Sequence, residues 1–399
     1  MFSNSRRRSA FSVALLTAGH FFSDFYVTFL PGLLPMLIER LGLSLTVSGL
    51  LVMVYSAASN ILQPVFGYFV DKSGYTWIVL LTIPLAALFI SLAATADSVS
   101  SLFVYITLAG LASALFHPLG SALLGKVSTE ENKGLSMSVF IGGGNIGVAL
   151  APAVVIYFLL NYGAHNLIWL AIPGFLLSMA FYLTGIHKVK LVSPQKAAAV
   201  IGGTPWYRSA SLIKLNLVMG LRSWPQAVIP NFLPVWLVQK GFPPTLAGTM
   251  LTVFLAGGAI GSVFGGYVGD KLGRKRCIIG ALALCVPALY VFLMSHEVTS
   301  LTWIALGVSG AALQGTLPSS IVWAQDMLPT NAAMASGMML GLSFGLGGLG
   351  AAVTGAVADS IGLEQALIWM IAPLLLGLAI TISIPEKTTE SPAVATTVK

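Results

Sequence analysis

The chain has 399 residues, of which 56% are hydrophobic and only 8% are charged. Soluble domains carry about 25% charged residues, so the composition excludes a soluble globular domain and indicates a membrane protein. A net charge of +7 would suit a nucleic-acid partner, but the basic residues lie almost entirely on one side of the predicted membrane, so we expect none.

Twelve apolar segments predict transmembrane helices, because each is close to the ~20 residues that span a bilayer. The runs are continuous, whereas the strands of a β-barrel are short and alternate. The first span follows a short basic stretch, as in a signal peptide, but it is too long for one and we expect it to stay uncleaved. The expected spans are residues 11–38, 45–70, 77–96, 101–124, 134–160, 166–186, 210–238, 246–269, 277–295, 300–325, 332–358 and 365–384.

The basic residues predict how the chain is oriented. Seventeen of the 20 lysines and arginines lie on the side of both termini, two lie on the opposite side, and Arg222 lies within a span. Positively charged loops face the cytoplasm. We therefore expect a multi-pass protein with both termini cytoplasmic.

A repeat divides the chain into two halves. Residues 41–49 recur at 240–248, and residues 67–74 recur at 266–273, both at an offset of 199 residues. Each half holds six spans and has the same orientation, as in transporters built from parallel repeats. We therefore expect an all-α membrane protein with a substrate cavity between two six-helix bundles. The expected parts are a bundle at 1–186, a cytoplasmic linker at 187–208, a bundle at 209–386 and a cytoplasmic tail at 387–399.

Asp24 lies near the middle of the first span, where a charge is costly and usually functional. His20 lies four residues earlier and therefore on the same helix face. A carboxylate beside an imidazole can accept a proton and pass it on, so we expect Asp24, helped by His20, to couple transport to protons. The alternative is a polar group that only tightens helix packing.

His117 precedes Pro118 in the fourth span. The proline interrupts the helical hydrogen bonds and frees a carbonyl group. We expect His117 to be a second proton carrier, and the alternative is a histidine that packs between helices.

Arg222 is a fixed positive charge within the seventh span, because a guanidinium does not release its proton. We expect it to bind a negative group of the substrate or to balance Asp24. The alternative is a side chain that extends along the helix to the cytoplasm. Gln226 lies one turn further on the same face and is also expected to contact the substrate. Four more residues are expected to do so: Tyr26, Gln63, Asn145 and Gln314.

A charged loop, residues 266–276, follows the eighth span. It has glycines at a helix end and an aspartate that can pair with nearby cations. The first-half copy has Tyr75, Thr76 and Trp77 where basic residues are expected. The alternative for the basic residues is an orientation signal alone. The expected gating residues are Gly67, Asp71, Gly266, Asp270, Gly273, Arg274 and Asp326.

These motifs resemble those of a known family. The loop at 266–276 resembles the loop motif of the major facilitator superfamily. Residues 142–152 resemble its antiporter motif, with Ala151 and Pro152 where Gly-Pro is usual. Six stretches together resemble the fosmidomycin-resistance branch of that superfamily: residues 19–24, 62–68, 116–118, 143–147, 324–329 and 347–352.

The resemblance implies a drug exporter of the bacterial inner (cytoplasmic) membrane that exchanges its substrate for protons. It implies proton-handling roles for His20, Asp24 and His117, and a charged role for Arg222, where the branch more often has lysine. We expect a small amphiphilic or anionic substrate similar to fosmidomycin, a monomer, and neither a cofactor nor a metal.

Two other functions stay open. The chain could take up a small organic solute as a proton symporter or by facilitated diffusion, because the sequence does not give the direction of transport. A non-transporting membrane enzyme or receptor is the remote alternative. The sequence has no recognised nucleotide-binding loop, metal-ligand cluster or nucleophile–base spacing, so we expect no enzyme activity.

Overall fold

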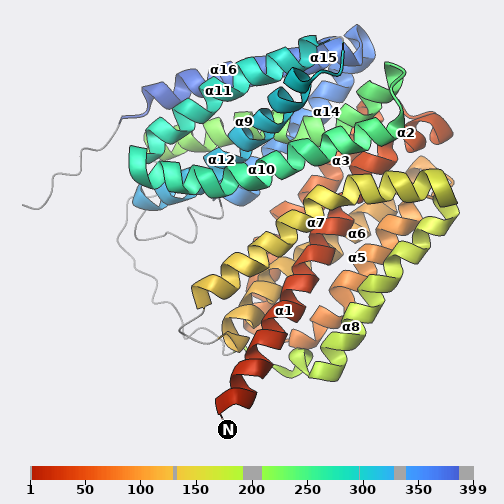
Figure 1. The fold of residues 1–399 in the computed structure, drawn as a ribbon, viewed down its shortest axis with the longest axis vertical. Coiled ribbons are helices and arrows are strands. Elements are labelled where there is room, and N and C mark those ends of the chain that lie inside the picture. The colour runs from red at the N-terminus through yellow and green to blue at the C-terminus, as the bar shows by residue number, and fades with distance from the viewer. Residues whose placement is uncertain (1, 129–132, 192–208, 296, 328–337, 386–399) are drawn as a thin grey trace, which may run out of the picture.

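The computed structural model describes residues 2–128, 133–191, 209–295, 297–327 and 338–385. Within these ranges the regular structure is helical, which confirms the predicted all-α class. The helices form two bundles that diverge toward the end that carries the N-terminus (Figure 1). Three predicted segments lie outside the described residues: most of the linker (192–208), the tail at 387–399, and the start of the eleventh span (332–337).

The first bundle consists of α1 (Phe2–Val27), α2 (Phe29–Leu41), α3 (Leu45–Ser56), η1 (Ala57–Ile61), α4 (Gln63–Ser73), η2 (Thr76–Ile78), α5 (Val79–Ala93), α6 (Val99–Val127), α7 (Lys133–Tyr162), η4 (Ala164–Ala171), α8 (Ile172–Thr184) and η5 (Ile186–Lys188). The second consists of α9 (Ala210–Gln239), α10 (Pro244–Leu272), α11 (Arg274–Met294), α12 (Ser300–Met327), η8 (Met338–Leu342), α14 (Ser343–Ile361), α15 (Leu363–Trp369) and α16 (Ile371–Ser383). Each predicted span falls on one of these helices or on two or three in succession.

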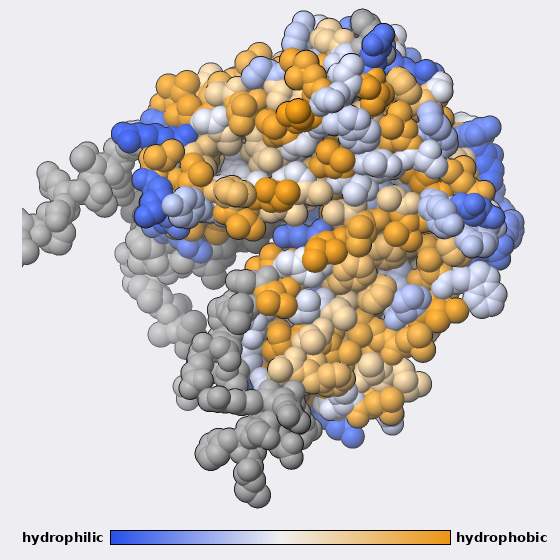
Figure 2. Space-filling view, viewed as in Figure 1, coloured by the Kyte–Doolittle hydropathy of each residue, from blue (hydrophilic) through white to orange (hydrophobic). Residues whose placement is uncertain are grey.

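Among the described residues, ten helical segments are long and apolar enough to cross a membrane by length and composition. Two further helices, α9 and α12, have 30 and 28 residues and carry several polar side chains, including Arg222 and Gln314. Many large apolar side chains are exposed on the outer surface of the bundles (Figure 2). The prediction of a multi-pass protein with twelve spans is thus confirmed.

The first span consists of two helices. Thr28 separates α1 from α2, and Pro31 has no N–H group to donate to the carbonyl of Val27, so the helical hydrogen bonds are interrupted. The hydroxyl of Thr28 donates to the carbonyl oxygen of Asp24 at 2.8 Å. Asp24 therefore lies one turn before a break in the span.

Three helix pairs join the bundles at the end away from the N-terminus: α3 packs against α14, α7 packs against α10, and α2 packs against α9. Glycine permits this approach, because a Cβ at Gly49 would lie 2.5 Å from the carbonyl oxygen of Ala351. Asp359 of α14 accepts hydrogen bonds from the backbone N–H groups of Leu45 at 2.9 Å and Thr46 at 2.8 Å. These contacts close one end of the space between the bundles.

Candidate functional site

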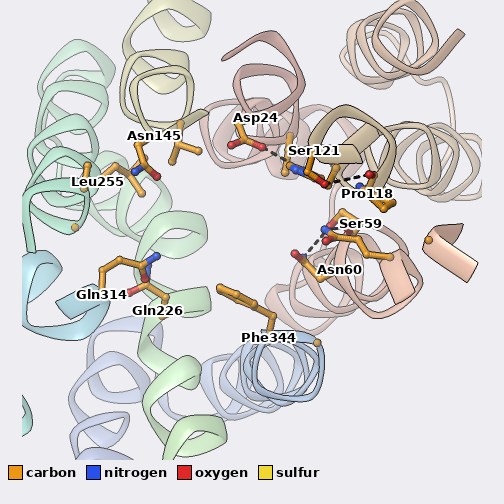
Figure 3. A pocket seen from close by; sticks show the side chains of 18 residues that line it. Asp24, Ser59, Asn60, Pro118, Ser121, Asn145, Gln226, Leu255, Gln314 and Phe344 are labelled. Carbon is orange, nitrogen blue, oxygen red and sulfur yellow. Dashed lines mark hydrogen bonds and ion pairs between the residues drawn. The ribbon is translucent and has the colours of Figure 1, made fainter. Parts of the chain in front are cut away.

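A cavity of about 640 Å³ lies between the two bundles. Small-molecule sites usually measure roughly 300–1,000 Å³, so this cavity can hold a drug-sized compound. Helices of both bundles contribute to its wall, and several of the side chains that point into it are polar (Figure 3). Seven of the predicted site residues line it: Asp24, Gln63, Gly67, His117, Asn145, Gln226 and Gln314.

Asp24 lies between two histidines. Its Oδ2 atom is 3.3 Å from Nε2 of His20, one turn earlier on α1. Its Oδ1 atom is 3.3 Å from Nε2 of His117, which α6 contributes. The structure thus brings together the three residues that the sequence predicts to handle protons.

The other ring nitrogen of His20 fixes its tautomer. Nδ1 lies 2.7 Å from the carbonyl oxygen of Phe140 on α7, and a carbonyl oxygen can only accept, so Nδ1 carries a hydrogen. In the neutral ring, Nε2 then carries none and faces the carboxylate of Asp24 with a lone pair. This contact is favourable when a shared proton or a cation lies between the two atoms, so the geometry suits a proton-binding pair.

Gly144 of α7 leaves the space for this cluster. A Cβ at this position would lie 2.4 Å from Oδ2 of Asp24 and 2.7 Å from Cε1 of His20. The glycine run of the fifth span predicts close helix packing, but it does not indicate that Gly144 and the carbonyl of Phe140 belong to the polar site. Their role follows from how α7 packs against α1.

Arg222 is buried in the second bundle, with 1% of its surface exposed. Its Nε donates to the carbonyl oxygen of Leu313 at 2.7 Å, and its Nη2 donates to Oε1 of Gln314 at 2.8 Å. Arg222 is not among the residues that line the cavity, and Gln314 is. In this conformation α12 holds the guanidinium behind the wall, and direct contact of Arg222 with the substrate stays a prediction.

Tyr26 also lies away from the cavity. Its ring is fully buried, and its hydroxyl donates to the carbonyl of Leu170 at 2.9 Å and accepts from the N–H group of Gly174 at 3.1 Å. These bonds hold the side chain against η4 and α8, and contact of Tyr26 with the substrate stays a prediction.

Three polar residues of the cavity wall were not predicted: Ser59, Asn60 and Ser121. Ser59 and Asn60 belong to η1, a π-helical turn between α3 and α4. Such turns occur often at functional sites. A serine–asparagine pair inside an apolar span is the signal that could have identified them.

The loop motif forms an ion-pair group in the second bundle. Arg274 lies 3.7 Å from Asp270 and 3.5 Å from Asp326, so it connects the ends of α10 and α12 at the start of α11. Gly67 lies against Pro118, and Gly266 lies against Pro318 in the same manner, as the repeat requires. Gly273 ends α10 with a φ of 93°. The structure does not describe the side chain of Asp71. The gating role of the seven residues named in the sequence analysis stays a prediction.

His20, Asp24 and His117 also have ligand atoms within 4.8 Å of one another, close enough to hold a metal ion. The tautomer of His20 suits a shared proton and a metal ion alike, because in both cases its Nε2 atom offers a lone pair. The expectation that the protein needs no metal stays a prediction.

Comparison with known proteins identifies the family. The family model of the Major Facilitator Superfamily matches residues 16–224 and 215–399. The chain belongs to the major facilitator superfamily. The twelve-helix architecture and the resemblance predicted from the motifs are thereby confirmed, and the chain is a membrane transporter of that superfamily.

Two relatives and one structure are similar over nearly the whole chain. The fosmidomycin resistance protein of Escherichia coli (strain K12) is 28% identical over 398 residues, covering 96% of this chain and 95% of that protein. The hexuronate transporter of the same strain is 24% identical and covers 88% of each chain. A bacterial homologue of the human lysosomal transporter Spinster, in an inward-facing and occupied conformation, has a TM-score of 0.81 at 14% identity, covering 94% of this chain and 96% of that one.

Proposed function

We propose that this transporter exports a small amphiphilic or anionic compound, such as a phosphonate, in exchange for protons. The support is a cluster of Asp24, His20 and His117 beside a cavity between two bundles. The similarity to a fosmidomycin resistance protein supports a drug of this chemical class.

The observation that carries the proposal is the geometry around Asp24. Each carboxylate oxygen lies 3.3 Å from an imidazole nitrogen, and Nδ1 of His20 donates to the carbonyl of Phe140. A proton shared between Asp24 and His20 would make this contact favourable. Because Asp24 and His117 line the cavity, this proton can exchange with water inside it.

Proton binding changes the charge of the cavity by one unit and thereby biases the balance between the two orientations of the bundles. The bundles are joined by α3, α14, α7 and α10 at one end and diverge at the other. If the termini are cytoplasmic, this conformation is open to the cytoplasm. Proton entry from the outside would then favour release of the compound there and return of the bundles to this conformation.

A resistance screen tests this function. The chain is expressed in a bacterial host that lacks its main exporters and is challenged with a compound panel that includes fosmidomycin and other phosphonates. We expect increased tolerance to at least one compound, and the tolerance should need Asp24. Unchanged sensitivity to the whole panel, with the protein present in the membrane, would contradict export.

Uptake by proton symport is the second candidate. It is favoured by the similarity to a hexuronate transporter and by electrostatics, because a bound anion favours the protonated form of a nearby carboxyl group. Accumulation of labelled glucuronate by cells that carry the chain would support uptake. If cells that carry the chain instead accumulate less of a drug than cells without it, and tolerate that drug better, the result would support export.

We also propose that the protein is a monomer of the bacterial inner membrane, with both termini cytoplasmic. The bacterial relatives and the distribution of basic residues support this topology. A fluorescent protein fused to the C-terminus should fold and emit light, whereas alkaline phosphatase fused there should be inactive. The reverse pattern would contradict the topology.

A further inference from the structure

We infer that Gln314 binds the acidic group of the substrate through its amide N–H groups, and that Arg222 is the residue that positions it. This inference rests on the proposed function and adds where, and by which atoms, an anionic compound is recognised. It starts from a contact between a buried guanidinium and a side chain on the cavity wall.

The contact fixes the orientation of the amide. Arg222 has only donors, and its Nη2 lies 2.8 Å from the end of the Gln314 side chain, so the atom that faces it is the acceptor Oε1. The NH2 group then lies on the side of the amide away from Arg222. Because Gln314 lines the cavity, this arrangement leaves two N–H donors for a ligand.

The guanidinium of Arg222 also supplies a positive charge. Among the described residues, no carboxylate lies within ion-pair distance of it. Its partners are the carbonyl of Leu313, Oε1 of Gln314 and, at 3.4 Å, the hydroxyl of Ser223, all of which are neutral. A buried charge with neutral partners acts over a longer distance than one in water, so the wall at Gln314 favours an anion.

A second amide on the same bundle has an unpaired acceptor. Gln226, one turn after Arg222 on α9, lines the cavity, and its buried Oε1 atom has no hydrogen-bond partner among the described residues. Buried polar atoms are normally paired. This oxygen can pair only with a hydroxyl or N–H group, so it complements the donors of Gln314 and does not itself bind an acid.

The alternative is that Arg222 only joins α9 to α12. Its bond to the carbonyl of Leu313 would serve that purpose alone. If Arg222 is purely structural, its replacement should weaken the binding of all ligands equally. A change at Gln314 should then affect the binding of an acid and of its ester to the same extent. The two interpretations thus differ in selectivity and not merely in stability.

Binding of fosmidomycin and of its neutral diethyl ester to the purified full-length chain tests the inference, by calorimetry at one pH and without a gradient. Gln314→Met removes the amide at nearly constant length. We expect this substitution to reduce the affinity for fosmidomycin about ten-fold or more and the affinity for the ester by much less. The matched control is Gln365→Met, on the exposed face of α15, which should change neither.

Arg222 is tested by the same pair of ligands. Arg222→Gln should reduce the preference for the acid, and Arg222→Lys should restore part of it, because lysine keeps the charge but not the planar fork. Equal losses for acid and ester in Gln314→Met, no loss for either, or no saturable binding of fosmidomycin to the wild type would each overturn the inference. Proton-driven transport with no preference for the acid would overturn this inference and leave the proposed function standing.

Discussion

At the scale of single residues, the central feature is the carboxyl group of Asp24, which lies inside a membrane-spanning segment. An ionised carboxylate costs at least several kcal/mol there, and a proton shared with the neighbouring histidines would reduce that cost for Asp24. Asp24 and His117 line a cavity, so the cluster is both partly buried and accessible to water. Those are the two conditions that a proton carrier in a transporter must meet.

Asp24→Asn should abolish proton-driven transport, because an amide neither gains nor loses a proton at physiological pH. Exchange of labelled for unlabelled compound across a membrane without a gradient should continue, since the fold and the cavity keep their shape. Asp97→Asn, in an exposed loop, is the matched control and should behave as the wild type. An unaltered pH dependence in the Asp24 variant would remove this residue from the mechanism.

Gly144→Ala should impair coupling without unfolding the protein. The added Cβ would meet Oδ2 of Asp24 at 2.4 Å, so the carboxylate must move away from His20. Gly142→Ala is the control on the same helix, because a Cβ there has no neighbour within 4 Å. Flux assays should show reduced proton-driven transport for the first variant only, and equal behaviour of the two would contradict the close packing.

How far the sequence predicts the site can be seen from three residues. The pairing of Asp24 with His20 follows from helical spacing, which is local. The approach of His117 does not, because it depends on how α6 packs against α1. The depth of Arg222 is predictable from its position in the span, but its direction depends on the packing of α9 against α12. Local spacing therefore identifies the residues and tertiary packing decides their partners.

At the scale of elements, Asp359 is the polar contact that joins α14 to the start of α3. It accepts from the N–H groups of Leu45 and Thr46 and, at 2.6 Å, from the hydroxyl of Thr46. The repeat places Leu160 at the equivalent position of the first half, so this contact has no counterpart on the α7–α10 side. The α3–α14 and α7–α10 contacts therefore differ in their chemistry.

Asp359→Asn should weaken the contact between α14 and α3 at the closed end. The amide has one acceptor oxygen in place of two, while three donors of Leu45 and Thr46 remain. Spin labels at Asn161 and Ser360, which are exposed near this end on different bundles, report the distance between them. We expect the variant to populate longer distances than the wild type. The two native cysteines are buried and should not take up the label.

Glu364→Gln is the control for this measurement. Glu364 pairs with Lys240 at 2.8 Å, close to the same end of the molecule but within one bundle. Its loss should leave the distance distribution unchanged. The same shift in both variants would mean that charge at this end, and not the contact of Asp359 with α3, governs closure.

Element boundaries were predictable where one apolar run forms one helix, as for α6 and α10. They were not predictable at η1, where a π-helical turn departs from the period of 3.6 residues on which sequence patterns depend. The same turn directs Ser59 and Asn60 to the cavity. The unpredicted wall residues and the unpredicted local geometry thus have one cause.

At the scale of the whole molecule, the internal repeat explains most of the architecture. Two similar bundles with a cavity between them follow from six spans in each half. The repeat does not determine which end is open, because that depends on the balance between two sets of contacts. In this structure the contacts at α3, α14, α7 and α10 close one end, and the bundles diverge toward the N-terminal end of α1.

Transport into inside-out membrane vesicles tests most directly whether the cluster couples protons to movement of the compound. The lumen of such vesicles corresponds to the outside of the cell, and a compound that confers resistance in the screen is supplied in labelled form. With an acidic lumen, we predict uphill uptake that stops when a proton–potassium ionophore removes the gradient and that is absent in Asp24→Asn. Uptake that is equal with and without the gradient, or equal in the wild type and Asp24→Asn, would contradict proton-coupled export through this cavity.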